Sequence, residues 1–188
     1  MLSETKIRLL VFSTLFPNNV SPHHGVFVEQ RLRHLLSSGA VSARVVAPVP
    51  WFPFRSPRFG TYGQYADIKT EEFRYGITTT HPRYVVIPKF GMTAAPLLLA
   101  LATLRSLHTA KHREDFDIID AHYFYPDGVA AVMLGKLLNK PVVITARGTD
   151  VNLIPDYYLP RRWILWAADQ CRHIVTVSEA LREQLLTL

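Results

Sequence analysis

The side chains best suited to chemistry lie in two places, each at the end of an apolar run. Arg147 follows the run 142–146, and His122 follows the run 116–121. Arg147 carries a permanent charge and five donors in a fixed plane, so it suits phosphate or sugar oxygens and cannot act as a general base. An imidazole can exchange a proton near neutral pH. Arg147 and His122 are therefore our candidate catalytic residues, although a purely structural hydrogen-bonding role for His122 is the alternative.

Six further residues are candidates for binding a ligand. Gly25 closes a long loop at the mouth of a helix, where free backbone N–H groups and the helix dipole favour an anion. A simple helix cap is the alternative there, since neither G-x-G-x-x-G nor G-x-x-x-x-G-K-[ST] is present. Capping is also open for Asp150 and is the favoured role of the last pair. The full set is Gly25, Asp127, Gly148, Asp150, Ser178 and Glu179.

Metal and serine-hydrolase chemistry are poorly supported by the residue pattern. The closely spaced histidines, His23-His24 and the pair His108 and His112, have no carboxylate or cysteine beside them in a known ligand pattern. Cys171 is the single cysteine, and no G-x-S-x-G motif is present. We therefore expect no metal and no cofactor.

Strand-like and helix-like segments alternate along the chain, which predicts an α/β fold with a Rossmann-like, mostly parallel sheet and helices on both faces. The ends of parallel strands in such a sheet form the ligand crevice, which would bring the candidate residues together. We expect strands at 7–12, 43–47, 116–121, 142–146 and 173–177, with one or two less regular strands in 71–87. We expect helices at 26–36, 93–111, 127–138 and 159–168 and after Ser178, and a loop at 48–65.

Composition favours one globular domain with an anionic partner. The chain has 188 residues and a net charge of +6, which suits phosphates, nucleic acid or an anionic bilayer without choosing among them. The longest apolar run, 92–104, contains Pro96 and is shorter than the roughly 20 residues that a membrane span needs. The N-terminus does not read as a signal peptide, and the single cysteine fits a reducing compartment. We therefore expect a cytoplasmic protein.

The segment 51–59 combines Trp51, three phenylalanines, prolines and two arginines. An exposed apolar cluster edged with cations is suited to a lipid-linked acceptor or to peripheral contact with an anionic membrane. The alternative is that these aromatic side chains fold back over the sheet and extend the core.

Four segments in register resemble glycosyltransferase family 4, whose members have the GT-B fold and retain the anomeric configuration of the transferred sugar. They are the strand 7–12 with its loop and the helix Val26-Phe-Val-Glu-Gln-Arg-Leu-Arg-His-Leu35, Asp117-Ile-Ile-Asp-Ala-His122, Pro141-Val-Val-Ile-Thr-Ala-Arg-Gly-Thr-Asp150, and Ala168-Asp-Gln-Cys-Arg-His-Ile-Val-Thr-Val-Ser178. The resemblance implies an N-terminal, acceptor-binding domain over residues 1–188. It also implies a nucleotide-sugar donor, a glycan or lipid-linked acceptor, and no nucleic-acid partner.

Two departures from the family pattern bear on this interpretation. The position of Arg147 is frequently histidine in the family, and the donor-binding C-terminal domain has no counterpart in this chain, so we expect these residues alone to be inactive. Two other readings stay open. One is half of another GT-B enzyme, such as a nucleotide-sugar 2-epimerase, and the other is a stand-alone nucleotide- or phosphate-binding module.

Overall fold

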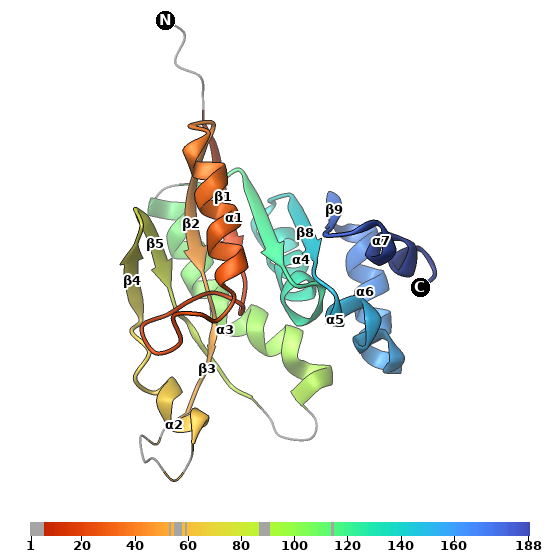
Figure 1. Cartoon of the computed structure of the whole chain (residues 1–188), viewed down its shortest axis with the longest axis horizontal. Helices are drawn as coiled ribbons and strands as arrows, with labels where there is room; N and C mark the ends of the chain where they lie inside the picture. The colour runs from red at the N-terminus through yellow and green to blue at the C-terminus, as the bar shows by residue number, and fades with distance from the viewer. Residues whose placement is uncertain (1–5, 53, 55–57, 59, 87–90, 114) are drawn as a thin grey trace, which may run out of the picture.

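A mostly parallel sheet forms the centre of the molecule (Figure 1). The computed structural model describes residues 6–52, 54, 58, 60–86, 91–113 and 115–188. Within this part of the chain the sheet has seven strands in the order β4-β5-β2-β1-β7-β8-β9, and only β4 runs antiparallel to its neighbour. The strands are β1 (Ile7–Phe12), β2 (Val41–Val46), β4 (Glu71–Arg74), β5 (Ile77–Thr80), β7 (Ile118–His122), β8 (Val142–Ala146) and β9 (His173–Thr176).

The helices lie on both faces of this sheet, as the alternating pattern predicts. On one side α1 packs against β1 and β2, and on the other α3, α4 and α6 contact one another. The helices are α1 (Val26–Ser37), α2 (Thr61–Tyr65), α3 (Gly91–Arg113), α4 (Val129–Leu138), α5 (Thr149–Asn152), α6 (Tyr158–Gln170) and α7 (Glu179–Leu186). The short turn η2 (Phe124–Gly128) lies between β7 and α4, and the short turn η3 (Ile154–Asp156) lies between α5 and α6. A small second sheet pairs β3 (Val49–Pro50) with β6 (Arg83–Tyr84).

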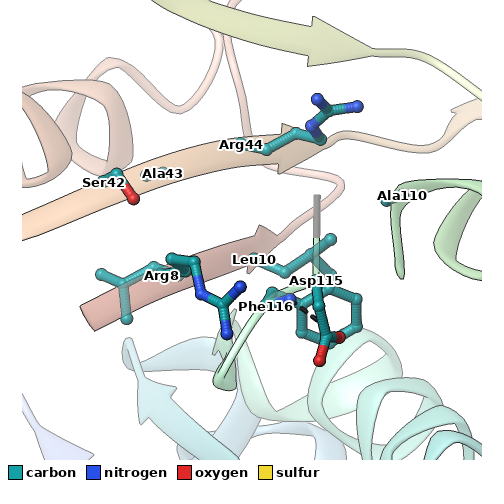
Figure 2. Close-up of a pocket in the computed structure, with 9 residues that line it drawn as sticks. Arg8, Leu10, Ser42, Ala43, Arg44, Ala110, Asp115 and Phe116 are labelled. Carbon is teal, nitrogen blue, oxygen red and sulfur yellow. Dashed lines mark hydrogen bonds between the residues drawn. The ribbon is translucent and has the colours of Figure 1, made fainter. Parts of the chain in front are cut away.

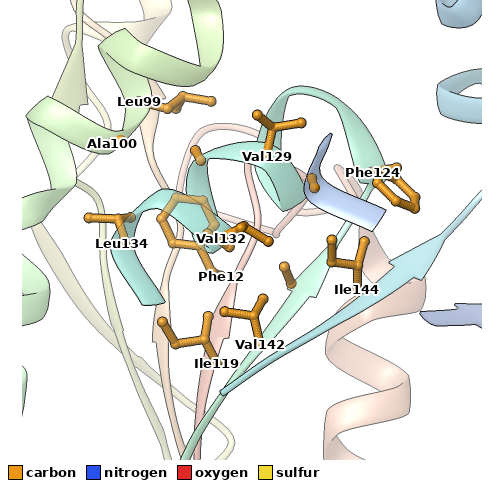
Figure 3. Close-up of a cluster of buried hydrophobic side chains, with 14 of the residues drawn as sticks. Phe12, Leu99, Ala100, Ile119, Phe124, Val129, Val132, Leu134, Val142 and Ile144 are labelled. Carbon is orange, nitrogen blue, oxygen red and sulfur yellow. The ribbon is translucent and has the colours of Figure 1, made fainter. Parts of the chain in front are cut away.

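The core has two layers because successive strand residues point to opposite faces. In β1, Leu10 and Phe12 belong to the layer beneath α3 and α4, whereas Val11 belongs to the layer beneath α1. Figure 3 shows the larger layer, in which side chains of α4 meet those of the strands below, among them Val132, Ile119 and the others labelled there. Helix α4 is apolar on almost every side, as befits a helix held between neighbouring helices and the sheet.

The sheet has a topological switch point at its centre, between β1 and β7, because successive strands are added on opposite sides of this point. From β1 the chain builds outward through β2 on one side and through β7, β8 and β9 on the other. Such a point leaves a crevice at the carboxyl ends of the strands, where doubly wound proteins bind their ligands. The loop after β1 and the residues that end β7 and β8 all lie at this edge.

The predicted fold class is confirmed, with differences at three places. Helix α4 begins at Val129 and not at Asp127, because Tyr125 has extended backbone angles (φ −129°, ψ 127°) inside η2. The predicted loop 48–65 contains the short elements β3 and α2. Residues 71–87 were expected to form one or two strands, and within the described part they form β4, β5 and β6. None of the described helices is long and apolar enough to cross a bilayer.

Candidate functional site

The loop after β1 is held at the crevice by a buried carboxylate. The Asp127 side chain is fully buried, and it accepts hydrogen bonds from the Thr14 backbone N–H at 2.8 Å and from the Thr14 hydroxyl at 2.9 Å. Ser13 Oγ donates to the His122 carbonyl at 3.1 Å, which ties the same loop to β7. The expectation that Asp127 binds a ligand is thus not supported by its position, since its oxygens point to the loop and away from solvent.

Burial also changes the acidity of this carboxyl group. Removal from solvent raises the pKa of Asp127 to about 7, and the hydrogen bonds from Thr14 and Ser13 only partly oppose that rise. Asp127 therefore titrates near neutral pH as a structural tether of the β1 loop.

Gly25 is required by the close approach of two backbone segments. It caps α1 in the left-handed conformation (φ +65°), and a Cβ atom there would collide with the carbonyl group of Leu15. No side chain caps the helix, so the first N–H groups of α1 face the mouth of the crevice without a side-chain acceptor in the described residues. Gly25 is thus the predicted N-cap, and its placement is compatible with the anion-binding role as well.

The ends of β7 and β8 bring the two candidate catalytic residues into direct contact. Arg147 Nη2 lies 2.9 Å from His122 Nδ1, and on the other side of the ring His122 Nε2 lies 3.3 Å from Asp120 Oδ2. Arg31 of α1 completes the group, because its Nη1 donates to Asp120 Oδ2 at 2.7 Å. We call Arg31, Asp120, His122 and Arg147 the edge cluster.

Within the edge cluster the exposures differ sharply. His122 is 1% exposed and Asp120 is 5% exposed, so neither meets solvent. Burial is the main cause that lowers the pKa of His122, and the charges of Arg31 and Arg147 lower it further, whereas Asp120 opposes the change. Burial would raise the pKa of Asp120, but the hydrogen bonds and charges of His122 and Arg31 outweigh it and lower that pKa. His122 is therefore neutral and enclosed, and the expectation that it lines the crevice directly needs correction.

Arg147 is the member of the edge cluster that can reach a ligand. It is half-buried, and its guanidinium lies over the Phe27 ring at 4.7 Å, a favourable cation–π distance. Its Nε is buried without a hydrogen-bond partner among the described residues. Arg147 is therefore fixed on two sides by protein groups, and its side chain also borders a hollow at this edge of the sheet.

Asp150 fastens the turn that carries Arg147. It is fully buried and accepts from the backbone N–H groups of Gly148 at 2.7 Å, Arg147 at 3.0 Å and Phe124 at 2.5 Å. These bonds join the segments after β7 and β8, so the structure gives Asp150 a structural place and no access to a ligand. Gly148 has φ +143°, a conformation that glycine adopts more readily than other residues.

A hollow of about 510 Å³ at the same edge gathers three of the predicted residues. Its lining consists of Arg147, Gly148, Asn152, Val177, Ser178, Ala180, Leu181 and Gln184. Ser178 Oγ also accepts from the Leu181 N–H at 3.2 Å, so the predicted capping role is confirmed. Glu179 is exposed and pairs with Arg182 at 2.7 Å, outside the lining of the hollow.

Another hollow, of about 390 Å³, lies at the opposite edge of the sheet, where the strands begin (Figure 2). Arg8, Arg44, Asp115 and Phe116 are among its lining residues. Its charged groups already have partners, since Arg8 pairs with Asp117 at 2.6 Å and Asp115 with Lys140. The switch point and the predicted residues are at the other edge, so we assign the functional site there.

Sequence reasoning missed Arg31 and passed over Asp120. Phe27 and Arg31 are four residues apart on α1, so they share one helix face, and that face meets Arg147 and His122. The signal was present in the helical spacing, but only the fold shows that this face turns toward the end of β7.

As for metals, no group of three or more potential ligands gathers among the residues that the structure describes.

The aromatic segment 51–59 lies only partly within the described residues, because 53, 55–57 and 59 fall outside them. Trp51 is 52% exposed and Phe54 is 56% exposed. Phe52 stands 5.9 Å from Phe54 and 5.7 Å from Tyr62 between ring centroids. The aromatic residues therefore contact one another at the surface, which argues against a core lid formed by Trp51 and Phe54.

The fold and the site define the class of protein, which is one half of a GT-B structure. UDP-GlcNAc 2-epimerase from Methanocaldococcus jannaschii has a similar fold over 97% of this chain and 42% of its own, with a TM-score of 0.51 at 9% identity. UGT73P12 from Glycyrrhiza uralensis, complexed with glycyrrhetinic acid 3-O-monoglucuronide, is similar over 96% of this chain and 47% of its own, with a TM-score of 0.51 at 9% identity.

Sequence comparison gives the family. The model of Glycosyltransferase Family 4 matches residues 65–188, about two thirds of the chain, so the chain belongs to this family. The "Putative teichuronic acid biosynthesis glycosyltransferase TuaC" of Bacillus subtilis (strain 168) is 32% identical over 156 residues, which cover 80% of this chain and 39% of that relative. The chain thus spans about two fifths of the length of this curated relative.

Proposed function

We propose that the protein is the acceptor-binding half of a retaining glycosyltransferase that moves a sugar from a nucleotide diphosphate to a glycan or lipid-linked acceptor. One observation carries the proposal beyond family membership. Arg147 stands at the strand edge with one side fixed by His122 and Phe27, and it lines the hollow at this edge. A donor fixed before the reaction stabilises developing negative charge without the cost of reorganisation.

Each residue at the edge has a place in this proposal. Arg147 contacts the acceptor or the transferred sugar and is the catalytic residue of this half. The loop that ends at Gly25 borders the donor diphosphate, to which the α1 N-terminus is attractive. Gly148 and Ser178 line the adjoining hollow, where a polar ligand group could lie. His122 acts through Arg147 and does not itself meet the ligand.

The relative named for teichuronic acid biosynthesis supports a polysaccharide as the product. We propose a hexose as the transferred sugar. The exposed Trp51 and Phe54, with the net charge of +6, support peripheral contact with the anionic inner face of the membrane and a cytoplasmic location. We also propose that transfer needs no metal, because arginine and helix N–H groups can offset the diphosphate charge. Activity that survives excess EDTA would agree with this, and activity restored only by a divalent ion would refute it.

The test of the proposed function is a transfer assay on the protein together with its donor-binding half. A panel of UDP-, GDP- and ADP-sugars is offered with and without a lipid-linked glycan primer, and the anomeric configuration of the product is read by NMR. We expect sugar transfer with retention that depends on the primer. Acceptor-independent epimerisation of the nucleotide sugar would support the 2-epimerase reading, and an inverted product would contradict retention.

A further inference from the structure

The edge cluster contains a chain of contacts that runs from α1 to the ligand-facing arginine. Arg31 Nη1 donates to Asp120 Oδ2 at 2.7 Å, and the same oxygen lies 3.3 Å from His122 Nε2. The opposite ring nitrogen, Nδ1, lies 2.9 Å from Arg147 Nη2. Residues from α1, β7 and the end of β8 thus meet on one imidazole ring.

The partners of His122 determine where its proton lies. A guanidinium only donates, so the nitrogen that faces Arg147 must offer a lone pair. Nδ1 is therefore unprotonated, and the single proton of the neutral ring is on Nε2. Arg31 Nη1 also lies 3.3 Å from Nε2, farther than the 2.9 Å between Arg147 Nη2 and Nδ1, and Asp120 Oδ2 lies 3.3 Å from Nε2 on the same side. The Asp120 carboxylate can only accept, so the Nε2–H is directed toward it.

Protonation of His122 would disrupt both contacts of this arrangement. A second proton would sit on Nδ1 and point at the Arg147 guanidinium, donor against donor. The charged groups that face the ring are Arg31, Arg147 and Asp120, so an imidazolium would meet two cations and one anion. The enclosed site, in which His122 is 1% exposed, offers no water to relieve that repulsion.

We infer that Asp120 and Arg31 are positioning residues: they hold His122 as the Nε2–H tautomer and thereby aim Arg147 at the ligand. Arg31 keeps Asp120 ionised and in place, Asp120 fixes the ring proton, and the bare Nδ1 then accepts from Arg147. Without the carboxylate, the ring can adopt the other tautomer, which repels the guanidinium. The effect on catalysis rests on the proposed function, but the proton assignment does not.

A second buried histidine in the same chain provides an internal contrast. His81 is also 1% exposed, but its Nδ1 lies 3.0 Å from the Ala47 carbonyl oxygen, which can only accept. His81 must therefore carry its proton on Nδ1. Two histidines of equal burial are thus assigned opposite tautomers from their partners alone.

The first test reads the tautomers by NMR with ¹⁵N-labelled histidine. We expect His122 to show a protonated Nε2 and a bare Nδ1, and His81 to show the reverse. At pH 5.5, where about 90% of free imidazole is charged, a smaller fraction of His122 should be charged, because burial and the two arginines lower its pKa. In Arg147→Ala the repelling donor is gone, so the pKa of His122 should rise while His81 is unchanged. A wild-type His122 that is protonated on Nδ1 overturns the inference, whether or not the protein transfers sugar.

The second test is a double-mutant cycle on transfer activity with the same sugar panel. Asp120→Asn keeps the volume and removes the charge, and we expect it to lower kcat/KM by about 10- to 100-fold, as for a displaced catalytic group. In the Arg147→Ala background the same change should cost less than about 3-fold, because its effect passes through Arg147. Equal losses in both backgrounds would mean that Asp120 only supports the fold, and would overturn the inference. If no transfer is found at all, the proposed function fails and the NMR result alone decides the inference.

Discussion

Arg147 Nη2 and His122 Nδ1 lie 2.9 Å apart, and this single contact joins the ends of β7 and β8. The two residues were predicted to share one crevice, and they do meet. They are not equivalent, however, because His122 is 1% exposed whereas Arg147 is half-buried and lines the hollow at this edge. The ligand-facing group at this edge is therefore the arginine, and the histidine is its support.

Arg147→Ala should lower kcat/KM of transfer by a factor on the order of 10²–10³, because one preorganised donor is lost. The melting temperature should barely change. Arg147→Lys should recover only part of the activity, since an ammonium lacks the planar set of donors that can serve His122 and a ligand together. Arg182→Ala is the matched control, as Arg182 is exposed and pairs with Glu179 on α7. Activity of Arg147→Ala within a few-fold of wild type would show that Arg147 is only a loop residue.

Gly25→Ala should destabilise the protein more than Gly39→Ala. Both glycines have positive φ, +65° and +74°, so each alanine bears a conformational cost of about 1–2 kcal/mol. Only at Gly25 would the new Cβ strike backbone, that of Leu15, whereas the space beside Gly39 is open. We expect the difference in unfolding free energy to exceed about 1 kcal/mol in denaturant melts. If both variants lose the same unfolding free energy, the loop after β1 shifts to accommodate the new Cβ atom at little cost.

Asp127 should make the protein less stable as pH rises. The folded chain holds this proton more tightly than the unfolded chain, whose aspartate titrates near pH 4. The stabilisation is therefore complete below about pH 4 and is lost as the pH passes the folded value of about 7. At pH 8 the loss should be on the order of 4 kcal/mol.

Thermal melts from pH 5 to pH 8 measure this effect. Asp127→Asn should flatten the dependence, since the amide can accept from the Thr14 N–H and donate to its hydroxyl without a charge. Asp156 is exposed, and Asp156→Asn should leave the pH dependence of the melting temperature as in wild type. An Asp127→Asn curve that runs parallel to wild type would contradict the assignment.

The aromatic cluster should bind anionic membranes. Replacement of Trp51, Phe52 and Phe54 by alanine should abolish co-sedimentation with phosphatidylglycerol vesicles, because the apolar side chains that enter the interface are removed. A triple alanine variant of Tyr157, Tyr158 and Leu159, which are also exposed apolar or aromatic side chains on and before α6, serves as control. If wild type and the Trp51 variant sediment alike, the membrane proposal is wrong.

Much of the fold was readable because its signals are local. Apolar runs at 7–12, 116–121 and 142–146 gave the central strands, and the alternation with helices gave the parallel sheet. The β4–β5–β6 region was less well defined, since its strands are short and two of them are partly exposed. The start of α4 was placed two residues too early, because the irregular turn η2, with its extended Tyr125, precedes the helix.

The site was predicted in position more successfully than in role. Strand ends placed His122 and Arg147 together, but sequence carries no sign of which side chain the packing encloses. Asp127 and Asp150 were predicted to bind a ligand, with helix capping as the alternative for Asp150, and both are buried against backbone N–H groups of loops. Arg31 lay 91 residues from its partner His122, beyond the reach of any local pattern.

The most direct test of the account is calorimetry of this 188-residue chain with UDP-, GDP- and ADP-sugars, after circular dichroism has confirmed that it folds. Retaining transfer needs donor and acceptor held between two domains, and one wall of the cleft leaves the nucleotide without most of its partners. We predict dissociation constants weaker than about 1 mM, equivalent to about −4 kcal/mol, and no turnover of the donor. Micromolar binding of any of these sugars, or measurable turnover, would show that the site is complete within these residues and would contradict the assignment of this chain as an acceptor-side half.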